Sequence, residues 1–128
     1  FDCGKDYFEV EVLEGEGAWV GVTTKAGFGP GYKLKALLYG GNLSDGGGLL
    51  RGHFGPDGVK TGDVVGVSLD LTDPAVFGVT LWHNDKYLGE AFACPRPEPG
   101  TTLYPVVSGR KAGDRFRISL RREVRQPV

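Results

Sequence analysis

The stretch DVVGVSLDLTDPAVFGVTLWHNDKYLGEAFAC, residues 63–94, determines the predicted fold. In its first part, apolar side chains stand at every second position: Val65, Val67, Leu69 and Leu71. A period of two places these side chains on one face of a β-strand and their neighbours on the other face. Asp73-Pro74 ends the strand, because proline has no N–H to donate to a sheet ladder.

A second alternating run follows the proline, with four residues facing one way: Phe77, Val79, Leu81 and His83. We expect Asn84-Asp85 to turn the chain, because both residue types tolerate positive φ in a tight hairpin. A third strand, residues 87–93, then returns. The connections are too short for a helix, so the stretch predicts an antiparallel meander of three strands.

The sequence on both sides of this stretch also predicts β-strands. Residues 7–13 and 18–24 alternate, and the short connection between them predicts a hairpin. Further strands are expected at 49–54, 103–107 and 115–121, whereas 34–39 fits a helix or a strand and 40–48 is a turn. Regular turns and the absence of helical periodicity predict an all-β fold, a sandwich or a barrel.

Length and composition indicate one ordinary globular domain. The chain has 128 residues, which fit a single domain 1–128, with a core at about 5–121 and a frayed tail at 122–128. The net charge of −1 gives no electrostatic reason to expect nucleic acid or an anionic membrane as a partner. No apolar run approaches the ~20 residues that span a bilayer. The chain opens at Phe1 without a methionine, which fits a piece of a larger polypeptide.

The two cysteines favour an intracellular protein. Cys3 and Cys94 could in principle form a disulfide, but two free thiols in a reducing compartment fit a chain that is not disulfide-dense. Together with His53 and His83 they show no spacing typical of metal ligands. We therefore expect no metal and no cofactor.

Six segments in order resemble the SPRY domain family: KDYFEVEVLEGEG, WVGVTT, LLYGGNLSDGG, TGDVVGVSLDL, LWHNDKYLGEAF and LYPVVSG. The resemblance covers about residues 5–120. It differs at Val22, where the family often has tryptophan, and at Asp85, where it has glycine. The N-terminal strands that many members carry are also missing, which leaves an edge or a core face for another segment to cover.

The resemblance implies a bent β-sandwich of two antiparallel sheets, a concanavalin-A-like architecture. It also implies a non-catalytic adaptor or scaffold that binds a short segment of a partner protein through loops at one end. The alternatives are an architectural part of a larger assembly or channel, a carbohydrate-binding sandwich and a small glycosidase.

The residues expected to contact the partner lie in loops or are exposed aromatics: Trp19, Lys25, Phe28, Tyr32, Lys33, Tyr39, Arg51, His53, Phe54 and Trp82. Tryptophan is enriched at interface anchors, but Trp82 and Trp19 would serve the core instead if the outward faces of their strands are covered. A rim of mixed aromatic and basic side chains would favour an acidic or polar peptide.

The glycosidase alternative depends on Glu9, Glu11 and Glu14, which follow a carboxylate spacing similar to that of jelly-roll enzymes. Retaining glycosidases need two carboxyl groups ~5–5.5 Å apart across the sugar. The simpler interpretation is a solvent-facing strand whose glutamates pair with Arg115 and Arg117 of the last strand. We therefore predict that the protein is not an enzyme.

Overall fold

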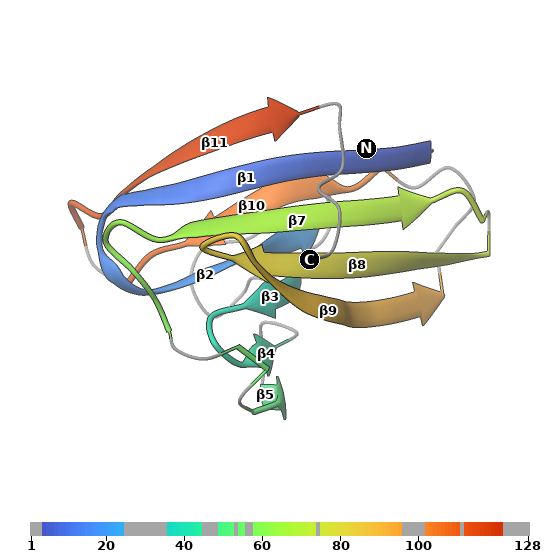
Figure 1. Ribbon diagram of the computed structural model, residues 1–128, viewed down its shortest axis with the longest axis horizontal. Coiled ribbons are helices and arrows are strands. Elements are labelled where there is room, and N and C mark those ends of the chain that lie inside the picture. Colours follow the sequence, from blue (N-terminus) through green and yellow to red (C-terminus); the bar gives the residue numbers. More distant parts are fainter. Residues whose placement is uncertain are drawn as a thin grey trace.

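The computed structural model is a sandwich of two antiparallel sheets (Figure 1). It describes residues 4–24, 36–44, 49–52, 54–55, 58–73, 75–95, 102–110 and 112–121. No helix occurs in these ranges, so the predicted all-β class and the two-sheet sandwich are confirmed.

The five-stranded sheet has the order β11-β1-β7-β8-β9. Its strands are β1 (Gly4–Glu14), β7 (Val64–Leu71), β8 (Val76–His83), β9 (Lys86–Pro95) and β11 (Arg115–Arg121). β7, β8 and β9 are consecutive neighbours, as the predicted meander requires. Asn84 and Asp85 both have positive φ, 51° and 68°, which is the twist that a two-residue hairpin turn needs.

The second sheet has the order β10-β2-β3-β4-β5, with β6 pairing with β2. Its strands are β2 (Glu16–Thr23), β3 (Ala36–Tyr39), β4 (Leu43–Ser44), β5 (Leu49–Arg51), β6 (Val59–Lys60) and β10 (Tyr104–Ser108). For the described residues 36–39, β3 resolves the ambiguity between a helix and a strand in favour of a strand. β4 lies within the predicted turn and β6 was not predicted, because two residues are too few to show a period.

The predicted hairpin between residues 7–13 and 18–24 is wrong. β1 pairs with β11 and β7, whereas β2 pairs with β10, β3 and β6, so the short connection carries the chain from one sheet to the other. Gly15 and Gly17 have φ values of 150° and 69°, which allow the sharp change of direction. A short connection alone therefore did not determine which strands pair.

The core lies between the sheets and consists of the inward-facing members of each alternating run. The predicted inward residues of β7 and β8 are all buried, which confirms the period-two interpretation. The largest fully buried side chains between the sheets come from β1, β2, β3, β6, β7 and β8: Phe8, Val10, Val12, Val20, Val22, Tyr39, Val59, Val65, Val67, Leu69 and Leu81. Packing of this core sets the positions of the strand ends, and the connections between strands begin at those ends.

Candidate functional site

Several connections meet at one end of the sandwich, which we call the loop end. It is formed by the β3–β4 turn (40–42), the described part of the β5–β6 connection (52, 54–55 and 58), the β6–β7 turn (61–63) and the β8–β9 turn (84–85). The Gly55 N–H donates to the Gly41 carbonyl oxygen at 3.0 Å, which ties the β5–β6 connection to the β3–β4 turn. Connections held by a rigid scaffold are where proteins most often carry their binding residues.

Asp63 is the centre of a hydrogen-bond network at the loop end. Its Oδ2 accepts from the Lys60 N–H at 3.1 Å and lies 2.9 Å from His83 Nε2, and its Oδ1 accepts from Asn84 Nδ2 at 2.9 Å. Asn84 also contacts β7, because its Oδ1 accepts a hydrogen bond from the Val64 N–H at 2.8 Å. One carboxylate thus joins the β6–β7 turn to the β8–β9 turn.

The environment of Asp63 favours its charged form. Burial by itself raises the pKa of a carboxyl group. The hydrogen bonds from Asn84, His83 and the Lys60 N–H, together with the charge interaction with His83, outweigh burial and hold the pKa of Asp63 below its ordinary value of 3.8. An ionised carboxylate can only accept, so His83 Nε2 is the donor in this pair.

The network continues across the sandwich to the second sheet. Tyr39 Oη lies 2.7 Å from His83 Nδ1, and the two rings meet edge to face with centroids 5.7 Å apart. Tyr39 is completely buried, and His83 and Asp63 are 5% and 6% exposed. A substrate cannot reach groups that are covered in this way. The arrangement therefore holds the turns in place and offers no reactive group to solvent.

Two of the predicted contact residues lie beside the β3–β4 turn and are partly exposed. Phe54 packs edge to face on Tyr39, with ring centroids 6.4 Å apart. Trp19 lies on the outward face of β2 against Gly40, where an added Cβ would come within 2.7 Å of the indole. Both side chains are half-buried, so each presents part of an aromatic ring to solvent at the loop end.

The structure contradicts the expectation that Tyr39 and Trp82 are exposed. Tyr39 faces the core, where its hydroxyl has a partner in His83. Trp82 faces outward from the sheet as predicted, yet only 3% of it is exposed, and Tyr7 and Tyr87 pack against its ring. The direction of a strand side chain was read correctly, but it does not tell whether that face is covered.

The remaining predicted contact residues are not described in full. Arg51 ends β5 opposite Leu43, at the loop end, although its side chain is outside the description. The others lie outside the described residues: Lys25, Phe28, Tyr32, Lys33 and His53. The described ends of the 25–35 segment, Thr24 and Ala36, lie at the opposite end of β3 from Tyr39.

The three glutamates of the glycosidase alternative do not act as a set. Glu9 is 7% exposed and accepts a hydrogen bond from the Tyr7 hydroxyl at 2.8 Å. Glu11 pairs with Arg117 at 3.4 Å and Glu14 with Arg115 at 3.7 Å. The predicted cross-strand pairing with the last strand is therefore confirmed for Glu11 and Glu14.

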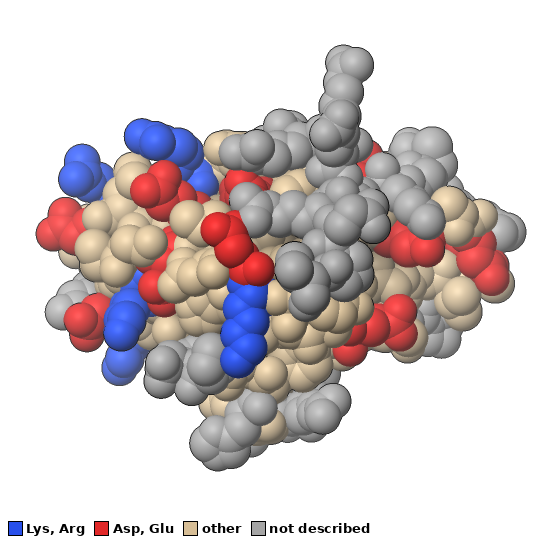
Figure 2. All heavy atoms as spheres, viewed as in Figure 1, with Lys and Arg blue, Asp and Glu red and all other residues tan. Residues whose placement is uncertain are grey.

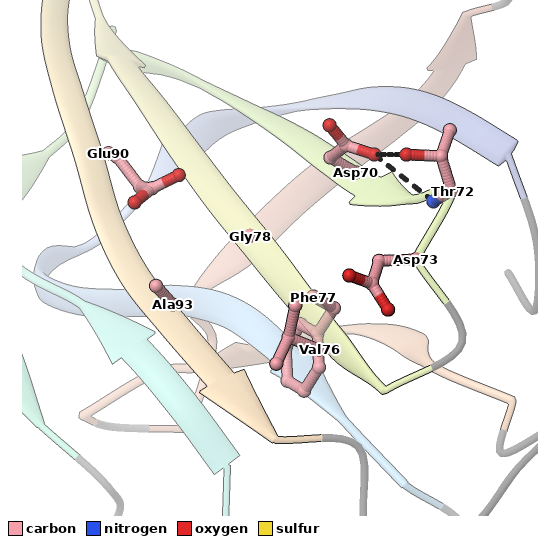
Figure 3. A pocket seen from close by; sticks show the side chains of 8 residues that line it. All are labelled: Asp70, Thr72, Asp73, Val76, Phe77, Gly78, Glu90 and Ala93. Carbon is pink, nitrogen blue, oxygen red and sulfur yellow. Dashed lines mark hydrogen bonds between the residues drawn. The ribbon is translucent and has the colours of Figure 1, made fainter.

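A small pocket of about 180 Å³ lies at the other end of the molecule, where β7 leads into β8. Figure 3 shows Glu90 reaching in from β9, and Asp70 and Asp73 from the end of β7 and the β7–β8 connection. Asp70 Oδ1 accepts hydrogen bonds from the N–H and the hydroxyl of Thr72 at 3.1 and 2.6 Å. Carboxylates around a partly apolar floor would suit the side chain of a lysine or arginine.

The described basic side chains are unevenly distributed over the surface. In the view of Figure 2, acidic side chains lie at both ends of the molecule, whereas the described basic side chains lie away from the end with the β7–β8 connection. Within the described ranges, no group of three or more potential metal-ligating side chains comes together. The same ranges contain no helix that is long and apolar enough to cross a membrane.

Sequence reasoning missed the roles of Asp63, His83 and Asn84. One signal was present, because His83 occupies an inward position in a strand whose other inward residues are apolar. A buried imidazole needs hydrogen-bond partners, so such a histidine indicates a polar network. Its partners could not be identified from sequence, since they lie 20 and 44 residues away along the chain.

Comparisons with known proteins agree with this architecture. The family model of the SPRY domain matches residues 5–123. The crystal structure of the SPRY domain of human HERC1 is similar with a TM-score of 0.67 and 18% identity, covering 94% of this chain and 76% of that one. A second human SPRY domain has a TM-score of 0.61 and 20% identity, covering 93% and 78%. No curated protein sequence matches the chain.

Proposed function

Because the chain belongs to the SPRY domain family, whose members are generally protein-interaction modules, we propose that it binds a short segment of a partner protein through its loop end. In this proposal the module acts without catalysis and inside the cell. Free thiols at Cys3 and Cys94 would fit that compartment.

The strongest support for this site is that hydrogen bonds hold its turns in place. Asp63, His83 and Tyr39 connect the β6–β7 turn, the β8–β9 turn and β3 through buried hydrogen bonds. A binding surface held in place before the partner arrives loses less conformational freedom on binding. Such a platform suits recognition by the side chains that surround it.

Phe54 and Trp19 are the described side chains best placed to contact the partner. Each is half-buried beside the β3–β4 turn, so it combines a fixed position with an accessible ring. Aromatic side chains supply large contact area for few rotatable bonds. Arg51 and His53 precede Phe54 in the chain and would add basic character, which favours an acidic or polar segment.

A phage-displayed library of random peptides, selected against the domain, tests this proposal. We expect the selected peptides to be rich in acidic residues, and we expect Phe54→Ala or Arg51→Ala to abolish their binding. Tyr104→Ala is the matched control, because Tyr104 is an exposed aromatic on β10, outside the loop end. Circular dichroism would verify that each variant is folded.

Two results would contradict the proposal. One is the selection of no peptide above the background of an unrelated β-sandwich. The other is a set of peptides whose binding survives Phe54→Ala and Arg51→Ala but is lost in Tyr104→Ala, which would place recognition around Tyr104, at the end of the β10–β2 pair away from Trp19.

A further inference from the structure

The apolar face of the five-stranded sheet continues past the second sheet at β11. Ile118 on β11 pairs with Val10 on β1, and residues directly opposite each other in an antiparallel pair point to the same face. Val10 is completely buried in the core, whereas Ile118 on the same face is 46% exposed. In Figure 1, β10, the edge strand of the second sheet, lies behind β1 and β7, and β11 extends beyond it. The inward face of β11 is therefore only partly covered.

β11 is also an edge strand. Among the strands that the structure describes, β11 has one neighbour, β1. The backbone N–H and C=O groups on the other side of an edge strand can pair with an added strand. A strand added beside β11 would also place its own inward side chains next to Ile118. Strand addition would thus satisfy the backbone edge and cover the exposed apolar side chain together.

The outward face of β11 is basic. The side chains of Arg115 and Arg117 alternate with the inward ones and are 69% and 65% exposed. Each contacts one glutamate of β1, at 3.7 Å for Glu14 and 3.4 Å for Glu11. A guanidinium group carries five N–H donors, so each arginine can bind a further carboxylate. Opposite charges placed directly across a strand pair stabilise it, so an added strand should carry acidic residues opposite these arginines.

The charges of β11 select against a second copy of this chain. Antiparallel pairing of two β11 strands about Ile118 sets Arg115 opposite Arg121. Pairing about Arg117 sets that residue opposite its own copy. Like charges directly opposite each other destabilise a strand pair. At the other edge of the same sheet, β9 carries an exposed glutamate, Glu90, on its outward face, which would repel an acidic strand. An acidic strand therefore fits the β11 edge in particular.

We propose that the β11 edge is a second interaction surface, which binds an extended segment of a partner protein in which apolar and acidic residues alternate. The segment adds a strand beside β11, its apolar side chains cover Ile118, and its acidic side chains pair with Arg115 and Arg117. Main-chain hydrogen bonds provide the affinity of such a complex, and the alternating side chains provide its specificity. This surface is independent of the proposed binding at the loop end.

Binding of the synthetic peptide EVEVEVE, followed by the fluorescence anisotropy of a labelled sample, tests the proposal. We expect it to bind the domain about tenfold more tightly than KVKVKVK, which keeps the alternation and reverses the charge. Ile118→Ser should weaken the binding of EVEVEVE several-fold. Val76→Ser is the matched control, because Val76 on β8 is equally exposed, at 45%. Arg117→Glu should reduce the preference for the acidic peptide, and circular dichroism would verify that each variant is folded.

A second measurement uses the unchanged domain, so it does not depend on the folding of a variant. Successive N–H groups of a strand point to opposite sides, so methylation of the backbone nitrogens of the valines alone, or of the glutamates alone, blocks one side of the peptide. If EVEVEVE adds a strand, one of the two methylated peptides should lose its binding and the other should retain it.

Four results would overturn the proposal. The first is equal binding of EVEVEVE and KVKVKVK, and the second is an equal loss for the two methylated peptides. The third is binding that survives Ile118→Ser but is lost in Phe54→Ala, which would assign the peptide to the loop end. The fourth is a dimer of the domain, detected by analytical ultracentrifugation, that Ile118→Ser dissociates, because a second copy would then occupy the edge.

Discussion

Tyr39 on β3 and His83 on β8 join the two sheets through the interior of the sandwich, with Tyr39 Oη 2.7 Å from His83 Nδ1. His83 in turn lies 2.9 Å from the Asp63 carboxylate. Apolar packing in the core between the sheets has no preferred direction. This hydrogen-bonded chain therefore helps to fix the relative position of the two sheets at the loop end.

Tyr39→Phe should destabilise the domain although it removes a single atom. The phenylalanine ring fills the same space, but His83 Nδ1 loses its partner in a buried site, which costs about 1–3 kcal/mol. The free energy of unfolding in urea measures the effect. Tyr87→Phe is the control, since Tyr87 is exposed and its change should be within about 0.5 kcal/mol. Equal stabilities for the two variants would refute the role given to the Tyr39 hydroxyl.

Asp63 should make the free energy of unfolding depend on pH in the acid range. The pKa of Asp63 in the folded protein lies below the ordinary value of 3.8. Its contribution to the free energy of unfolding is therefore complete above pH 3.8 and is lost as the pH falls through the folded pKa. The stability difference between the wild type and Asp63→Asn should therefore be largest near neutral pH and shrink as the pH falls below about 4. Urea titrations at several pH values would measure it. A difference that stays constant from pH 6 to the acid limit would exclude the linkage.

The alternation of side chains predicted most of the strands and the inward faces, because parity is a local property of an extended chain. Val65, Val67 and Leu69 are buried as expected. Pairing is not local, which is why residues 7–13 and 18–24 were predicted to pair but lie in different sheets. The class of fold could therefore be read from the sequence more reliably than its connectivity.

The candidate site was less predictable for the same reason. Trp82 was correctly placed on an outward face, but its cover depends on Tyr7, which is far away in the chain. Phe54 and Trp19 remain accessible because of where the β3–β4 turn lies. The solvent exposure of a side chain depends on the whole assembled sandwich, so the residue pattern within one strand cannot predict it.

Glu9 and Glu11 should respond differently to loss of charge. Glu9→Gln changes a buried carboxylate that accepts a hydrogen bond from Tyr7, so we expect a loss of about 1 kcal/mol. Glu11→Gln changes a pair at the surface with Arg117, and such pairs contribute about 0–1 kcal/mol. Thermal unfolding would compare the two. A larger effect at Glu11 than at Glu9 would contradict the burial and pairing described for them.

Gly55→Ala should destabilise the domain because Gly55, in the β5–β6 connection, lies directly against the Tyr39 side chain. A Cβ at position 55 would overlap the Tyr39 hydroxyl, and overpacking of this kind costs about 1–3 kcal/mol. Adding Tyr39→Phe removes the atom that overlaps most, although two ring carbons remain at 2.7 and 2.9 Å, so the double variant should lose less stability than the sum of the single variants. Gly58→Ala is the matched control, since the nearest atom to its added Cβ is at 3.9 Å. If the two losses simply add, the connection does not rest on the Tyr39 hydroxyl, and the loop end lacks the rigid floor on which the proposed recognition depends.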